Sequence, residues 1–76
     1  MKKSDRQKSM DYIKVYLGAI NTGEVFYGSI LAEYVNERLR ANHQPDTIIK
    51  YARTLRQNGE LNYKCIYKPE GKYVKL

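Results

Sequence analysis

The stretch 44–61, QPDTIIKYARTLRQNGEL, predicts a helix whose two ends are both marked. Pro45 suits the first turn of a helix, and Asn58 followed by Gly59 favours a C-terminal end. The apolar positions between them recur at spacings of four and three, the period of a buried helical stripe: Ile48, Ala52 and Leu55. We therefore expect a helix from Pro45 to just before Asn58, with this stripe turned inward.

After this helix the period of the sequence becomes two, as in a strand. Alternate residues of 61–68 divide between the two faces of the expected strand: Leu61, Tyr63, Cys65 and Tyr67 on one, and Asn62, Lys64, Ile66 and Lys68 on the other. Val74 and Leu76 continue an apolar alternation in a second strand. The connecting residues 68–71, KPEG, place proline second and glycine fourth, as a type I turn prefers. The chain is therefore predicted to end in a β-hairpin.

Two further helices and a short strand are predicted before residue 44. The first helix, over about residues 5–20, has an apolar stripe formed by Met10, Ile13, Leu17 and Ile20. The second begins at Gly28 and Ser29, ends near Ala41, and has its inward positions at Leu31, Val35 and Leu39. Residues 24–27, EVFY, form a β-prone run between these helices.

Residues 1–9, MKKSDRQKS, carry four basic side chains and one acidic side chain, which is typical of a solvated arm or a frayed first turn. We therefore divide the chain into a basic N-terminal arm, 1–9, and a single domain, 10–76. A chain of 76 residues is too short for a large enzyme cleft beside a full core. The expected fold class is α+β, with three helices, a short strand and a C-terminal hairpin.

The stretch 44–61 resembles the third helix and first wing strand of winged helix-turn-helix DNA-binding domains. The matching positions are Pro45, Thr47, Ile48, Leu55, Gly59 and Leu61, and 31–33, LAE, resembles the start of that family's second helix. The chain departs from the pattern at Ala52, where a larger aliphatic is usual, and at Gln44, where Ser, Thr or Asn usually caps the helix. The order of elements matches over 10–76, which implies a three-helix winged helix-turn-helix domain with the hairpin as its wing.

The charge of the chain favours a polyanionic partner. There are 14 Lys and Arg against 8 Asp and Glu, a formal net charge of +6. Residues 36–76 hold nine basic and four acidic side chains, whereas 12–35 hold one basic and two acidic. The positive charge is therefore concentrated in the half that contains the third helix and the hairpin.

At 100° per residue, polar side chains lie opposite or at the edges of the apolar stripe of the third helix. The expected base-reading residues are Asp46, Thr47, Lys50, Arg53 and Gln57. Such side chains can pair with cytosine, thymine, guanine and adenine edges in the major groove. The expected contacts to the DNA backbone are Arg38, Arg40, Tyr51, Lys64, Lys68 and Lys72, with Lys2, Lys3, Arg6 and Lys8 in the arm.

These observations predict a small sequence-specific double-stranded DNA-binding protein that regulates transcription or replication. The third helix would enter the major groove, and the wing would lie on the backbone or in the minor groove. A single module of this kind buries only roughly 600–1,000 Å², so we expect a homodimer or a protein partner, with Tyr12 and Tyr16 of the first helix at the contact.

Two other functions remain open from the sequence. The same fold can serve as a protein-interaction module, such as a small phage-encoded inhibitor of a host or defence complex. An RNA binder is a further alternative, because Tyr63, Tyr67 and Tyr73 alternate with lysines and aromatic rings stack on bases. Lysines near the hairpin tip could equally protect a strand edge from aggregation.

Other classes find no support in the pattern of residues. His43 is the only histidine and Cys65 the only cysteine, so no metal-ligand spacing and no catalytic pairing can be recognised. We expect no enzyme activity, no metal, no cofactor and no small-molecule substrate. The longest apolar stretch, 15–20, is too short to span a membrane, and the single cysteine suits a reducing compartment. We therefore expect a cytoplasmic protein, associated with the nucleoid if it comes from a bacterium, a phage or a mobile element.

Overall fold

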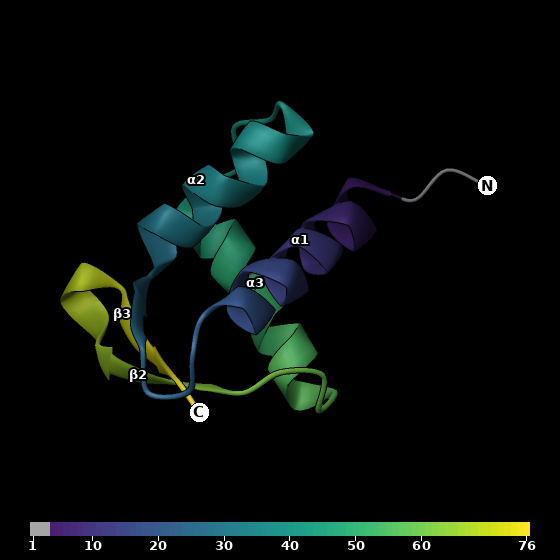
Figure 1. Cartoon of the computed structure of the whole chain (residues 1–76). Coiled ribbons are helices and arrows are strands. Elements are labelled where there is room, and N and C mark those ends of the chain that lie inside the picture. Colours follow the sequence, from purple (N-terminus) through teal and green to yellow (C-terminus); the bar gives the residue numbers. More distant parts are fainter. Residues whose placement is uncertain (1–3) are drawn as a thin grey trace.

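In the computed structural model, the described residues 4–76 form three helices and a three-stranded sheet (Figure 1). The elements follow in the order α1 (Asp5–Ala19), β1 (Val25–Tyr27), α2 (Gly28–Leu39), α3 (Pro45–Gln57), β2 (Tyr63–Tyr67), a 3-10 turn (Lys68–Glu70) and β3 (Lys72–Lys75). The predicted α+β class, its three helices and its C-terminal hairpin are therefore confirmed.

The core lies where the apolar stripes of the three helices meet. Its helical residues are Met10, Ile13 and Leu17 of α1, Leu31, Ala32 and Val35 of α2, and Ile48, Ala52 and Leu55 of α3. All the positions that were predicted to point inward are buried except two. Ile20 and Leu39 are only half-buried. None of the helices in residues 4–76 is both long and apolar enough to cross a membrane.

Helix α1 begins inside the segment predicted as an arm. The Ser4 hydroxyl accepts a hydrogen bond from the Gln7 N–H at 3.2 Å, which caps the helix. Ser9 is buried, and its hydroxyl donates to the Asp5 carbonyl oxygen at 2.7 Å. Residues 5–9 are therefore the first turns of α1, whereas Lys2 and Lys3 lie outside the described residues.

A side chain organises the connection between α2 and α3. Asn36 Nδ2 donates to the His43 carbonyl oxygen at 2.8 Å, and the His43 N–H donates to Asn36 Oδ1 at 2.9 Å. Arg40 closes α2 in the left-handed conformation, with φ of 54°, so the helix ends two residues before the predicted end near Ala41. Gln44 makes no side-chain capping bond to α3, in which Pro45 is the first residue.

The sheet has the order β1-β3-β2, and both pairs of strands are antiparallel. Phe26 of β1 and Cys65 of β2 both lie opposite Tyr73 of β3. The Phe26 ring stacks on the Tyr73 ring at 5.4 Å, and the Tyr63 ring meets both of these rings edge-on. This aromatic face packs against the helices, which lie together on one side of the sheet (Figure 1).

The turn between β2 and β3 is held beside the start of α2 (Figure 1). The Gly71 N–H donates to the Lys68 carbonyl oxygen at 3.0 Å, and Gly71 adopts a left-handed conformation with φ of 60°. Proline and glycine thus occupy the turn positions that the sequence predicted. The Gly71 carbonyl oxygen in turn accepts a hydrogen bond from the Gly28 N–H at 2.8 Å, so the backbone fixes the turn against α2.

Candidate nucleic-acid interface

A groove of about 610 Å³ separates the first half of α3 from the β2–β3 turn. Its charged lining residues are Asp46, Lys50 and Arg53 of α3 and Lys68 and Glu70 of the turn. Ile49 and Tyr73 line it as well and give it an apolar part. Elements that are far apart in the sequence therefore present basic, acidic and apolar side chains to one space, which we call the α3–turn groove.

The width of the α3–turn groove depends on a close backbone approach at Gly28. A Cβ atom at this position would lie 3.2 Å from Ile49 Cγ1 and 3.3 Å from Ile49 Cδ1, closer than most side-chain contacts. Glycine therefore lets the start of α2 lie against α3, while its N–H holds the turn through Gly71. The two walls of the groove are thus positioned before any ligand arrives.

The basic side chains of the groove are available for an external anion. Lys50, Arg53 and Lys68 are exposed, and no ion pair joins any of them to another residue of the described chain. Asp46 and Glu70 are also exposed, so the groove offers acceptors as well as donors. This mixture suits a ligand that carries both phosphates and base edges better than it suits a simple anion.

Tyr73 adds a neutral donor to the groove. Burial raises the pKa of its hydroxyl above the ordinary value, the neighbouring Cys65 raises it further, and Arg53 opposes the shift. The hydroxyl is therefore protonated at neutral pH and can donate a hydrogen bond to a phosphate oxygen.

The structure exposes four of the five predicted base-reading residues of α3, but it does not bring all of them together. Asp46, Lys50 and Arg53 line the α3–turn groove. Gln57 is exposed near the C-terminal end of α3, outside the groove, and Thr47 is half-buried.

The predicted backbone contacts are more dispersed. Lys68 lines the groove, whereas Tyr51 is half-buried and packs against the core. The register places Lys64 and Lys72 on the face of the sheet that points away from the helices. The groove therefore gathers only one of these six predicted contacts.

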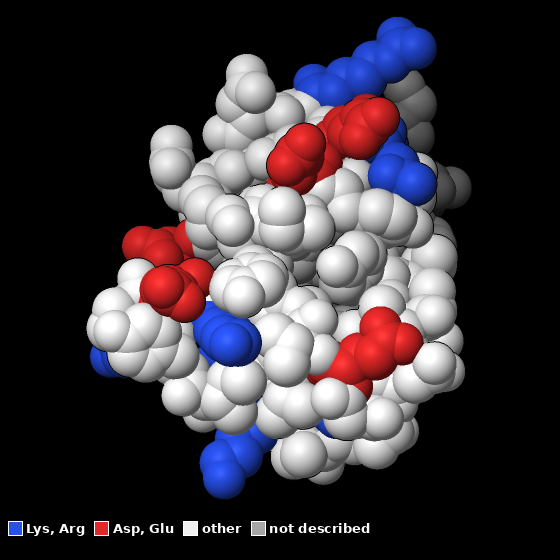
Figure 2. Space-filling model, turned by 60° about the vertical axis from the view of Figure 1, so that its left-hand side comes forward, with Lys and Arg blue, Asp and Glu red and all other residues white. Residues whose placement is uncertain are grey.

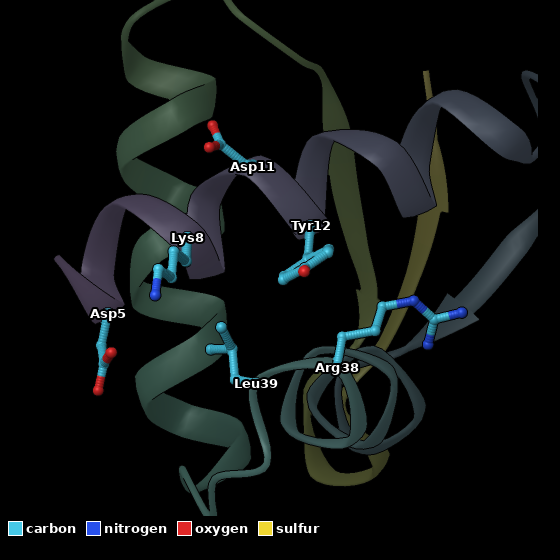
Figure 3. A pocket seen from close by; sticks show the side chains of 6 residues that line it. All are labelled: Asp5, Lys8, Asp11, Tyr12, Arg38 and Leu39. Carbon is cyan, nitrogen blue, oxygen red and sulfur yellow. The ribbon is translucent and has the colours of Figure 1, made fainter. Parts of the chain in front are cut away.

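Arg38 and Arg40 lie at the end of α2 and do not line the α3–turn groove. The Arg38 guanidinium stacks 3.5 Å from the centre of the Tyr34 ring and donates to the Tyr34 carbonyl oxygen at 3.3 Å. Arg38 also lines a second cavity, of about 410 Å³, between α1 and α2, where its side chain is directed away from Asp5 and Lys8 (Figure 3). Its contact with Tyr34 thus stabilises α2 rather than extending the groove.

Sequence reasoning did not name Ile49 or Arg56 as candidate site residues, and it named Tyr73 only for RNA binding. Ile49 and Tyr73 line the groove, and the Arg56 guanidinium lies 4.7 Å from the centre of the Tyr63 ring. Arg56 also donates to the Tyr63 carbonyl oxygen at 3.3 Å, which ties the end of α3 to β2. A signal for Ile49 was present, because a second isoleucine beside Ile48 points about 100° away from the stripe and indicates a second apolar contact.

Most of the tyrosines belong to the core or pack against it. Tyr63 is only 4% exposed, so it cannot stack on a base, and Tyr73 is half-buried beside it. The Tyr16 ring contacts the Phe26 and Tyr34 rings edge-on. Of the three tyrosines proposed for RNA binding, Tyr67 alone remains largely exposed, at 51%.

Comparisons of the chain with protein-family models, with curated proteins and with solved structures gave no match. The function is therefore inferred from the residues and their geometry.

Proposed function

We propose that the chain is a winged helix-turn-helix protein that binds double-stranded DNA in a sequence-specific manner and regulates transcription or replication. The order of elements supports this proposal, because it agrees with the order that the sequence resemblance implied. The three-stranded antiparallel sheet, with the order β1-β3-β2, is consistent with a winged-helix-like layout. In this arrangement α3 enters the major groove, and the hairpin of β2 and β3 lies against the adjacent backbone or in the minor groove.

The observation that carries the proposal is the α3–turn groove. Two basic side chains of α3, Lys50 and Arg53, share it with Lys68 of the turn, and none of the three has an ion-pair partner within residues 4–76. A helix about 10–12 Å across fits a major groove about 12 Å wide. A backbone phosphate beside the occupied major groove would then enter the space between α3 and the turn.

The side chains divide by chemistry between base edges and phosphates. Lys50 and Arg53 can donate to guanine O6 and N7, Gln57 can pair with adenine, and Asp46 can accept from cytosine N4. Lys68 and the Tyr73 hydroxyl, on the other wall of the groove, suit phosphate oxygens, which carry no sequence information.

A salt titration tests this proposal. If the domain neutralises about five phosphates, the logarithm of the duplex affinity falls against the logarithm of the salt concentration with a slope of roughly −4 to −5. Replacing Lys68 with glutamine is expected to make the slope shallower by roughly 0.9, since one phosphate contact is lost. Fluorescence anisotropy of a labelled duplex measures both slopes.

The half-buried Lys14 provides a control, because it pairs with Asp11 and Glu60, away from the groove. Replacing Lys14 with glutamine should leave the slope unchanged. A flat slope for the unaltered chain, or the absence of duplex binding at low salt, would reject the proposed function.

A further inference from the structure

The sheet has a second face, turned away from the helices, that carries exposed apolar and aromatic side chains. The register places Val25, Val74 and Lys64 in one row across the three strands, and Tyr27, Lys72 and Tyr67 in the next. Residues directly opposite one another share a face of the sheet, so these six side chains lie together. We call this surface the outer sheet face.

A bulge in β2 enlarges this face. The register shifts between Cys65, opposite Tyr73, and Tyr67, opposite Lys72, so Ile66 and Tyr67 together face one residue of β3. The exposed fractions are 44% for Val25, 38% for Tyr27, 45% for Ile66 and 51% for Tyr67. Four of the seven large exposed hydrophobic side chains found in residues 4–76 therefore lie on one small sheet surface.

The charge on the outer sheet face has one sign. Lys64 and Lys72 are its charged residues, and neither forms an ion pair with any residue from 4 to 76. The carboxylates nearest to these lysines in sequence, Glu60 and Glu70, lie outside the strands, and Glu60 pairs with Lys14 at 3.4 Å. Figure 2, in which the left-hand side of Figure 1 comes forward, shows acidic and basic side chains in small groups, with broad uncharged areas between the groups.

We propose that the outer sheet face binds single-stranded DNA. Tyr27 and Tyr67 flank Lys72 in one row, so two bases can stack on the rings while the phosphates that join them meet the lysine ammonium. Lys64, in the neighbouring row, continues the cationic track along the strand. Basic side chains interleaved with exposed aromatic rings are the usual construction of a single-strand binding platform.

The chemistry of the outer sheet face favours single-stranded DNA over a second copy of the chain and over RNA. A second copy of the chain would bring Lys64 and Lys72 against the same two lysines, which opposes face-to-face association. Val25, Val74 and Ile66 suit the thymine methyl group, which uracil lacks, and the deoxyribose. This inference concerns residues that the α3–turn groove does not use.

The test compares variants of the full chain in their binding to a labelled dT12 strand. Replacing Tyr27 or Tyr67 with leucine, which keeps an apolar side chain and removes the ring, is expected to weaken binding by about fivefold or more for each ring. Replacing the same tyrosines with phenylalanine should preserve the affinity, because the stacking surface remains. Replacing Lys72 with glutamine should make the salt slope for dT12 shallower by roughly 0.7.

The groove variants Lys50→Gln and Arg53→Gln separate this inference from the proposed function, since they should weaken duplex binding and leave dT12 binding unchanged. The inference is overturned if dT12 does not bind while the duplex does, or if dT12 binding follows Lys50 and Arg53 instead of the two tyrosines. Tighter binding of rU12, equal competition by poly-L-glutamate, or a dimer that the leucine variants dissociate would likewise overturn it.

Discussion

Replacing Phe26 with alanine is expected to lower the free energy of unfolding by about 3–5 kcal/mol. Phe26 is 2% exposed, and its ring contacts those of Tyr73, Tyr63 and Tyr16 at centroid distances of 5.4, 5.9 and 6.4 Å. The substitution therefore opens a cavity at the place where the sheet meets the helices. A domain of this size has a total stability of roughly 4–11 kcal/mol, so much of the chain would be unfolded at moderate urea concentrations.

Urea denaturation followed by circular dichroism measures this effect. Val25 supplies a matched control, because it precedes Phe26 in β1 and is 44% exposed on the other face of the sheet. Replacing Val25 with alanine should cost less than about 1 kcal/mol. Equal losses for the two variants would contradict the placement of Phe26 at the centre of the core.

The second large effect is expected on duplex binding. Replacing Lys50 and Arg53 together with glutamine should weaken the affinity for a preferred duplex by about 30- to 1,000-fold at low salt, since each contact to a base edge contributes about 1–2 kcal/mol. Discrimination between preferred and random duplexes should fall as well, because the proposal assigns the reading of base edges to these two side chains. Replacing Lys68 with glutamine should instead weaken all duplexes alike.

The control for the double variant removes the same amount of charge elsewhere. Arg6 and Lys8 are exposed on α1 and do not line the α3–turn groove. Replacing both with glutamine lowers the net charge by the same two units and should leave sequence discrimination intact. Comparable losses of discrimination in the two double variants would show that only net charge matters and would refute the division between base and phosphate contacts.

The elements of the fold could be predicted because their signals are local. Pro45 and Gly59 mark the two ends of α3, and burial of Ile48, Ala52 and Leu55 follows from their spacing. The turn at 68–71 follows from its proline and glycine in the same way. These features depend on backbone preferences and on the helical period, and both are determined by residues that are close together in the sequence.

The arrangement of side chains between elements could not be predicted in the same way. Alternation correctly grouped Tyr63 with Cys65, but the bulge carries Tyr67 out of that pattern and onto the outer sheet face. The stacking of Arg38 on the Tyr34 ring competes with the predicted contact of Arg38 to DNA. The spacing of apolar residues does not reveal a contact between a guanidinium and a ring. The pairing of β1 with β3 joins residues almost 50 positions apart, which no local pattern specifies.

The central claim is that duplex DNA contacts α3 and the turn across the groove between them. The most direct measurement is the change in backbone amide chemical shifts when a duplex selected from a random library is added to the isotopically labelled chain. We expect the largest changes in residues 45–57 and 68–71 and at Gly28, whose N–H holds the turn. Changes confined to α1 and α2 or to the outer sheet face, or no change at low salt, would contradict the claim.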